Sequence, residues 1–186
     1  AELNKAGKPW TLADLGCGNG SVSQVLAERG WNVTAVDASE DGIAQARARP
    51  TQRARPRYEL ASAYDDLAAS FGKFPVILSL EVVEHVYYPR RYARTLANLL
   101  APGGSAIVST PYHGYLKNLA LALSGRMDAH FTALWDHGHI KFWSVATLTQ
   151  LLAEVGLVPV QVLRVGRVPP LAKSMIFVVR HRDDAR

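Results

Sequence analysis

The sequence has little cysteine and no long hydrophobic run, and both features narrow what the chain can be. Among 186 residues there is one cysteine, Cys17, which cannot form an internal disulfide and is typical of a reducing compartment. The longest apolar runs, at 75–80 and 119–123, are far shorter than the ~20 residues of a membrane span. No basic-then-apolar leader opens the sequence, which predicts a cytoplasmic chain, and Ala1 in place of Met predicts processing or trimming.

The segment 47–57 contains no acidic residue, and arginines and two prolines are concentrated in it. The arginines there are Arg47, Arg49, Arg53, Arg55 and Arg57. A nucleic-acid platform would interleave aromatic side chains for base stacking, and only Tyr58 is near. A solvated basic loop is therefore the favoured interpretation, and the net charge of +5 makes a weak argument for a nucleic-acid partner. The 48% hydrophobic content is ample for a core and excludes a disordered chain.

Short apolar runs alternate with helical periodicity along the chain. Strands are predicted at 10–15, 32–37, 57–60, 75–80, 105–110, 157–165 and 174–180. Helices are predicted at 21–29, after a cap at Ser39, at 89–100 and after a cap at Ser144, with Val22, Val25 and Leu26 sharing the apolar face of the first. The last two strands leave no room for a crossover helix, so they pair antiparallel. The pattern predicts a doubly wound α/β fold whose sheet is mostly parallel.

The segment 111–143 is too long for an ordinary connection between two elements. It leaves the carboxyl end of the predicted fifth strand, which in open α/β sheets faces the ligand crevice. We interpret it as a lid over a substrate site, within a single domain that spans 1–186. A helix that merely decorates the rim remains the alternative.

A glycine-rich loop follows the first predicted strand. It reads Asp14-Leu15-Gly16-Cys17-Gly18-Asn19-Gly20, which lets the backbone turn sharply and lets a ligand approach closely. The spacing G-x-G-x-G differs from the dinucleotide fingerprint G-x-G-x-x-G. Asp14 would repel a pyrophosphate and attract an ammonium, while Asp37, which ends the second strand, could accept hydrogen bonds from ribose hydroxyls. The expected ligand is a nucleoside with a cationic substituent and no phosphates.

These motifs resemble the class I S-adenosylmethionine-dependent methyltransferases. The resemblance rests on DLGCGNG, VTAVDAS and LLAPGG, and EVVEHV with the later Lys141-Phe142 is similar to the ubiquinone-biosynthesis type of O-methyltransferase. It implies a Rossmann-like sheet of seven strands in which the last strand runs antiparallel between two others. It also implies S-adenosylmethionine as the cofactor.

The resemblance further implies a set of cofactor-binding residues. Asp14 and the backbone of Gly16 would hold the methionine amino group, and Asp37 would bind the ribose. The full set is Asp14, Gly16, Cys17, Gly18, Gly20, Asp37, Ala38, Ala63, Tyr64 and Leu80.

Candidate catalytic residues follow the fourth predicted strand. If a helical turn begins there, Glu81, Glu84 and His85 share one face, with His85 as the candidate general base. The three side chains could instead hold a divalent cation, which is possible but not favoured, or act structurally. His137 aligns with a histidine of the resembled subgroup and is the second candidate for contact with the substrate.

Other titratable and aromatic side chains gather between residues 85 and 143. His85, His113, His130, His137 and His139 predict a polar substrate pocket, and the cluster of Asp136, His137 and His139 is a weaker zinc alternative. Tyr112, Phe131, Trp135, Phe142 and Trp143 could wall an aromatic substrate or pack the lid against the sheet.

The sequence thus predicts methyl transfer from S-adenosylmethionine to an oxygen atom of a small-molecule acceptor. Methylation of nucleic acid or protein is the first alternative, although the Asn- or Asp-Pro-Pro-aromatic motif of DNA amino-methyltransferases is absent after the fourth strand. A catalytically silent module that retains the cofactor fold for a partner is the second.

Overall fold

The computed structural model describes residues 10–51, 54–131 and 133–185. Arg53 of the arginine-rich region therefore lies outside the described residues. The strands are β1 (Thr11–Leu15), β2 (Asn32–Asp37), β3 (Arg57–Leu60), β4 (Phe74–Leu80), β5 (Leu100–Pro111), β6 (Leu157–Val165) and β7 (Ser174–His181). The α-helices are α1 (Ser21–Glu28), α2 (Glu40–Ala48), α3 (Leu67–Phe71), α4 (Pro89–Leu99), α5 (Tyr115–Leu123), α6 (Met127–Phe131) and α7 (Val145–Ala153), with short 3₁₀ turns at Pro169–Leu171 and Arg182–Asp184.

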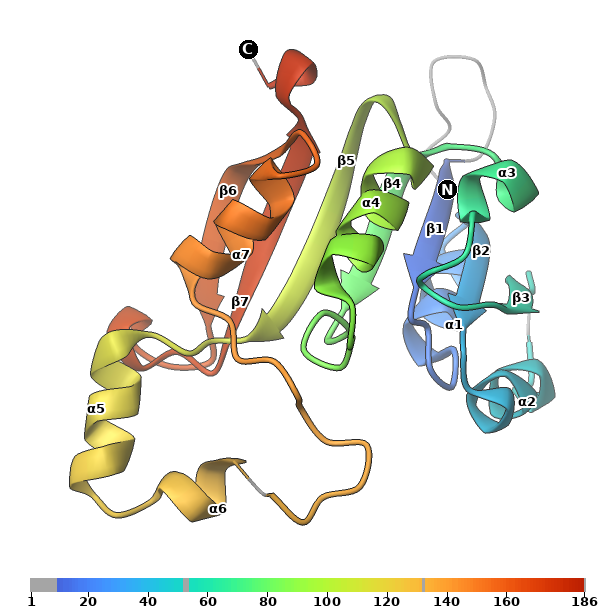
Figure 1. Ribbon diagram of the computed structural model, residues 1–186. Coiled ribbons are helices and arrows are strands. Elements are labelled where there is room, and N and C mark those ends of the chain that lie inside the picture. The colour runs from blue at the N-terminus through green and yellow to red at the C-terminus, as the bar shows by residue number, and fades with distance from the viewer. Residues whose placement is uncertain (1–9, 52–53, 132, 186) are drawn as a thin grey trace.

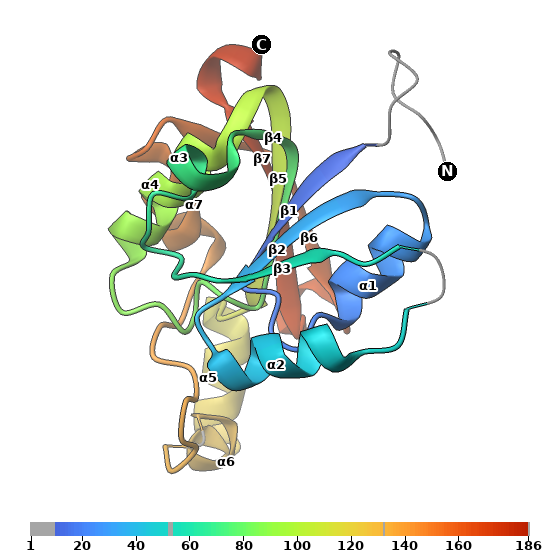
Figure 2. The same ribbon diagram turned by 90° about the vertical axis from the view of Figure 1, so that its right-hand side faces the viewer.

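The strands form one sheet in the order β3-β2-β1-β4-β5-β7-β6 (Figure 1). Neighbours from β3 to β5 run parallel, whereas β7 pairs antiparallel with both β5 and β6. Figure 2 shows α1 and α2 on one side of the sheet and α3, α4 and α7 on the other. The predicted doubly wound, mostly parallel sheet of seven strands is confirmed, including an antiparallel last strand between two others.

Apolar side chains from both faces of the sheet build the core. The larger cluster joins the central strands to α4 and α7 and includes the fully buried Ile77, Leu96, Leu148 and Phe177. A smaller cluster lies under α1 and α2. Serine caps begin two of the helices as predicted, because the Ser39 hydroxyl accepts from the Gly42 amide and Ser144 forms a capping box with α7.

Two local predictions are wrong, and one short helix was not predicted. The buried side of α1 carries Ser23, Gln24 and Ala27, while Val22 and Val25 are exposed, so the apolar periodicity does not mark the face that meets the sheet. The fifth strand is predicted to begin at residue 105, but β5 begins at Leu100, directly after α4, because the Pro-Gly-Gly stretch is extended and belongs to the strand. The short helix α3, capped by the Asp66 carboxylate, was not predicted.

The insertion between β5 and α7 contains α5 and α6. Its aromatic side chains do not line the cavity described below; Tyr112 and Trp143 are buried, and Phe131 and Phe142 pack at a ring separation of 4.8 Å. His113 and His130 lie within this packing, and of the five histidines predicted to form a pocket only His85 and His137 line the cavity. None of the helices in the described residues is long and apolar enough to span a bilayer.

Candidate functional site

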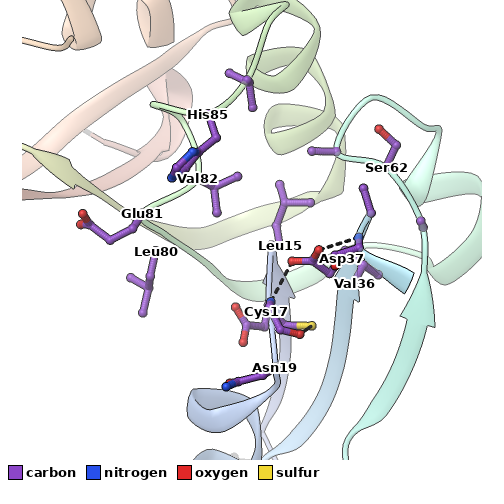
Figure 3. A pocket seen from close by; sticks show the side chains of 18 of the residues that line it. Leu15, Cys17, Asn19, Val36, Asp37, Ser62, Leu80, Glu81, Val82 and His85 are labelled. Atoms are coloured by element: carbon purple, nitrogen blue, oxygen red, sulfur yellow. Dashed lines mark hydrogen bonds between the residues drawn. The ribbon is translucent and has the colours of Figure 1, made fainter. Parts of the chain in front are cut away.

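A cavity of about 1150 Å³ opens where β1, β2 and β4 end, at the carboxyl edge of the sheet. Nearly every predicted cofactor residue lines it: Asp14, Gly16, Cys17, Gly18, Asp37, Ala38, Ala63, Tyr64 and Leu80. Of the predicted catalytic residues, Glu81, His85 and His137 line it as well. Figure 3 shows Asp37 and Cys17 on one side of this cavity and Glu81 and His85 on the other. One cavity therefore brings together side chains from distant parts of the chain.

The glycine-rich loop forms the floor of the cavity. The amides of Gly16 and Cys17 both donate to the Val36 carbonyl, which ties the loop to the end of β2. Gly16, Gly18 and Gly20 all have positive φ, a region that favours glycine. Gly20 does not line the cavity; a side chain there would lie 2.6 Å from the Tyr58 hydroxyl, so this glycine makes room for the tyrosine beneath the loop.

Gly16→Ala is expected to destabilise the protein and to weaken ligand binding at the cavity. Gly16 has a φ of 85°, and a Cβ there would overlap the Val82 side chain. The left-handed conformation alone costs about 1–2 kcal/mol, which lowers the Tm of a chain of this size by roughly 2–8 °C.

The control is Gly156→Ala, because Gly156 also has a positive φ of 77° but no described atom lies within 4 Å of the position of its Cβ. Thermal melts of both variants separate the conformational cost from the overlap with Val82. Equal losses in the two variants would contradict a tight fit between the loop and Val82.

The Asp37 carboxylate joins two loops at the end of β2. One oxygen accepts from the Gly18 amide at 2.7 Å, and the other accepts from the Ser39 amide at 2.8 Å. These bonds fix the orientation of the carboxylate, while each oxygen keeps a second lone pair for a ligand. The arrangement can bind two vicinal hydroxyl groups.

The Asp14 carboxylate lies deeper in the cavity and is only 3% exposed. Its Oδ2 accepts a hydrogen bond of 2.5 Å from the hydroxyl of Ser23 on α1. Burial raises the pKa of Asp14 to about 6; the Ser23 hydrogen bond opposes the shift, and the negative charge of Asp37 adds to it. A cationic ligand group would compensate this buried charge.

The segment after β4 is a turn and not the expected start of a helix. Glu81 has a φ of 56°. Its backbone amide donates a hydrogen bond to the Ser109 carbonyl of β5, and its carboxylate accepts a hydrogen bond from the Ser109 hydroxyl at 2.7 Å. The helical turn on which Glu81, Glu84 and His85 were expected to share one face does not form, and Glu84 is only 1% exposed and does not line the cavity. Burial raises the pKa of Glu84 to about 8, with a further contribution from the Glu81 carboxylate.

Residues 137–143, at the end of the insertion between β5 and α7, form a strap that holds this turn. The amides of Ile140 and Lys141 both donate to the Glu84 carbonyl, at 2.9 and 3.0 Å. The indole of Trp143 donates to the Val83 carbonyl at 3.0 Å, and His85 Nδ1 lies 3.3 Å from the Gly138 carbonyl. The strap therefore positions the His85 imidazole at the edge of the cavity.

One group of side chains in the described residues has the arrangement of a metal site. Ligand atoms of Glu84, His85 and His139 lie within 4.8 Å of one another. Both carboxylate oxygens of Glu84 lack a hydrogen-bond partner among the described residues, which fits a cation. Compared with the predicted trio of Glu81, Glu84 and His85, this set contains His139 in place of Glu81. Of the predicted zinc cluster it contains only His139, and not Asp136 or His137.

Several lining residues were not predicted. They include Asn19, Ser62, Val82, Gly138 and Ile140. Gly138 and Ile140 reach the cavity only because the strap folds back on the turn after β4, and no local pattern in the sequence indicates that contact. Ser62 lies two residues after the end of β3, so its position near a strand end was the available signal.

Comparisons with known proteins agree with this arrangement. Residues 2–162 match the family described as a methyltransferase domain. The ubiquinone biosynthesis O-methyltransferase of Caulobacter sp. (strain K31) is 45% identical over 125 residues, which cover 67% of this chain and 48% of that protein. The enzyme of the same name from Cereibacter sphaeroides (strain ATCC 17025) is 35% identical over 153 residues, covering 80% and 60%. The chain thus spans about half the length of the Caulobacter relative.

Solved structures agree on the fold. Magnesium protoporphyrin IX methyltransferase from Synechocystis, crystallised with SAH, superposes with a TM-score of 0.71 at 18% identity, over 92% of this chain and 74% of that chain. An S-adenosylmethionine-dependent methyltransferase from Mesorhizobium loti superposes with a TM-score of 0.70 at 21% identity, over 93% of this chain and 91% of that chain. The family match, the sheet order and the glycine-loop cavity lead to one conclusion: this chain belongs to the methyltransferase domain family.

Proposed function

We propose that this protein transfers a methyl group from S-adenosylmethionine to an oxygen atom of a small-molecule acceptor. The observation that carries the proposal is the charge of the cavity. Three carboxyl groups, those of Asp14, Asp37 and Glu81, line it, and neither lysine nor arginine is among its described lining residues. S-adenosylmethionine brings a sulfonium and an ammonium, whereas a dinucleotide would bring a pyrophosphate into a negatively charged pocket.

We propose one orientation of the cofactor in this cavity, on the basis of its polar lining groups. Asp37, held by the Gly18 and Ser39 amides, would accept hydrogen bonds from both ribose hydroxyls. Asp14 would accept from the methionine ammonium, and the adenine would lie between Ala38 and the Ala63-Tyr64 side of the cavity. This orientation places the sulfonium near Leu80, between the glycine loop and the turn that carries Glu81 and His85.

Methyl transfer from a sulfonium is an in-line displacement. A lone pair of the acceptor oxygen attacks the methyl carbon, the carbon–sulfur bond breaks, and its electrons remain on sulfur to give S-adenosylhomocysteine. The oxygen must lose its proton, and His85 at the edge of the cavity would accept it as general base. The protein otherwise aligns the two reacting atoms and excludes water.

The acceptor side of the cavity favours a hydroxylated small molecule. Glu81, His85 and His137 offer hydrogen-bonding groups there, and Val82, Val86 and Ile140 offer apolar contact. Two of the relatives above are named ubiquinone biosynthesis O-methyltransferases, which supports oxygen as the acceptor atom. We place the reaction in the cytoplasm, in line with the free thiol of Cys17.

A metal-assisted reaction is the second candidate, because Glu84, His85 and His139 form a donor set with unsatisfied carboxylate oxygens. A divalent cation there would act as a Lewis acid toward an acceptor hydroxyl. If this candidate operates, EDTA is expected to abolish turnover and magnesium to restore it. Turnover that is indifferent to EDTA, measured after exhaustive dialysis, eliminates the metal and leaves His85 as the base.

The proposed function is tested by incubating the protein with methyl-labelled S-adenosylmethionine and a heat-treated cell extract that contains metabolites, nucleic acid and protein. Label in small molecules is the expected result, with the methyl group located on oxygen by NMR of the purified product. Label in nucleic acid or protein would show that the acceptor is a macromolecule and not a small molecule. Binding of the cofactor without any transfer would indicate a silent module, and no binding would overturn the proposal.

A further inference from the structure

Ser23 is the only polar contact described for the Asp14 carboxylate, and it lies outside the predicted apolar face of α1. The side chain is fully buried at 0% exposure, and its hydroxyl donates to Asp14 Oδ2 at 2.5 Å. A serine at this position contributes no apolar packing to the sheet. Its burial is explained by the carboxylate that it contacts.

Among the described residues, the other groups around Asp14 do not supply a positive charge. Asp37, from β2, bears the same charge and raises the pKa of Asp14. Cys17 of the glycine loop and Tyr58 of β3 also feel the charge of Asp14, and burial raises the pKa of both, to about 12 for the thiol, so both are neutral near pH 7. The Ser23 hydroxyl is therefore the described group that stabilises the ionised carboxylate when no ligand is bound.

We infer that Ser23 is a positioning residue for the cofactor: its hydroxyl holds the Asp14 carboxylate ionised and oriented toward the methionine ammonium. This inference rests on the proposed binding of S-adenosylmethionine. An alcohol-to-carboxylate hydrogen bond favours the charged form of the acid, and it also fixes one carboxylate oxygen so that the other can face the ligand. Ser23 itself does not touch the ligand, since it does not line the cavity.

The expected consequence is a pH dependence of cofactor affinity that Ser23 sets. Because the ammonium binds the ionised carboxylate, affinity is full above the pKa of Asp14, about 6, and falls up to tenfold per pH unit below it. Ser23→Ala removes the bond that opposes the upward shift, so the midpoint moves toward neutral pH. A shift of about one unit weakens binding roughly fivefold at pH 6 and hardly at all at pH 8.

The experiment is calorimetric titration of the full chain with S-adenosylhomocysteine, which carries the same ammonium and is not consumed, over about pH 5 to 8. The wild type, Ser23→Ala, Asp14→Asn and the control Ser79→Ala are compared. Ser79 is an equally buried serine that contacts Tyr92 and lies outside the cavity. We expect an upward shift of the midpoint in Ser23→Ala, a flat and weak profile in Asp14→Asn, and the wild-type midpoint in Ser79→Ala.

The outcomes separate the inference from the function on which it rests. A merely structural role of Ser23 would weaken binding by the same factor at every pH, and that result, or an unchanged profile, overturns the inference while the cofactor assignment stands. A wild-type protein that binds no S-adenosylhomocysteine at any pH overturns the proposed function itself.

Discussion

Asp37→Ala is expected to weaken the binding of S-adenosylmethionine by about a hundredfold or more. The carboxylate would accept from two ribose hydroxyls, and hydrogen bonds to a charged group contribute about 1.5–3 kcal/mol each, where 1.4 kcal/mol is tenfold in affinity. The variant also leaves the Gly18 and Ser39 amides without their acceptor, which loosens both loops at the ribose side of the cavity. Isothermal titration with S-adenosylmethionine measures the loss.

Asp41→Ala is the control for this variant. Asp41 lies in the first turn of α2, close to Asp37 in sequence, but it is exposed, and the hydrogen bond described for its carboxylate comes from the Gln45 side chain. We expect its affinity for the cofactor to match that of the wild type. If Asp37→Ala bound as tightly as Asp41→Ala, the ribose would not lie at the end of β2.

His85→Ala is expected to lower turnover by about 10²–10⁴-fold and to leave cofactor affinity nearly unchanged, the range that removal of a general base produces. The imidazole lines the acceptor side of the cavity and is anchored at the Gly138 carbonyl, away from the residues proposed to hold the ribose and the ammonium. Initial rates with labelled cofactor, combined with calorimetry, separate the two effects.

His181→Ala is the matched histidine control, because His181 contacts the Leu100 carbonyl at the opposite edge of the sheet. It should retain both turnover and affinity. Full activity in His85→Ala would remove His85 from the reaction, and a parallel loss of cofactor affinity would assign it to binding.

The cofactor half of the site could be predicted from the sequence because its chemistry is local. Strand ends at Leu15 and Asp37 are marked by apolar runs that stop at a glycine loop or an acid, and parallel pairing brings those ends together. Backbone rules then fix the loop, since positive φ at three positions requires glycine.

The acceptor half depends on contacts between distant segments, and the sequence does not indicate them. The Trp143 indole contacts the Val83 carbonyl, which is 60 residues away in the sequence, and the His85 imidazole contacts the Gly138 carbonyl, which is 53 residues away. Glu84 is buried because this strap covers the turn, whereas local spacing predicted an accessible helical face. Ser23 was also missed: helical periodicity finds apolar faces, and the partner of α1 at this point is a buried carboxylate.

A crystal structure of the protein soaked with S-adenosylhomocysteine examines the central claim most directly. We expect density in the cavity at the ends of β1, β2 and β4, with both ribose hydroxyls within hydrogen-bond distance of Asp37 and the ammonium at Asp14. An empty cavity at saturating ligand, or a phosphate-bearing nucleotide bound there in preference, would contradict the account.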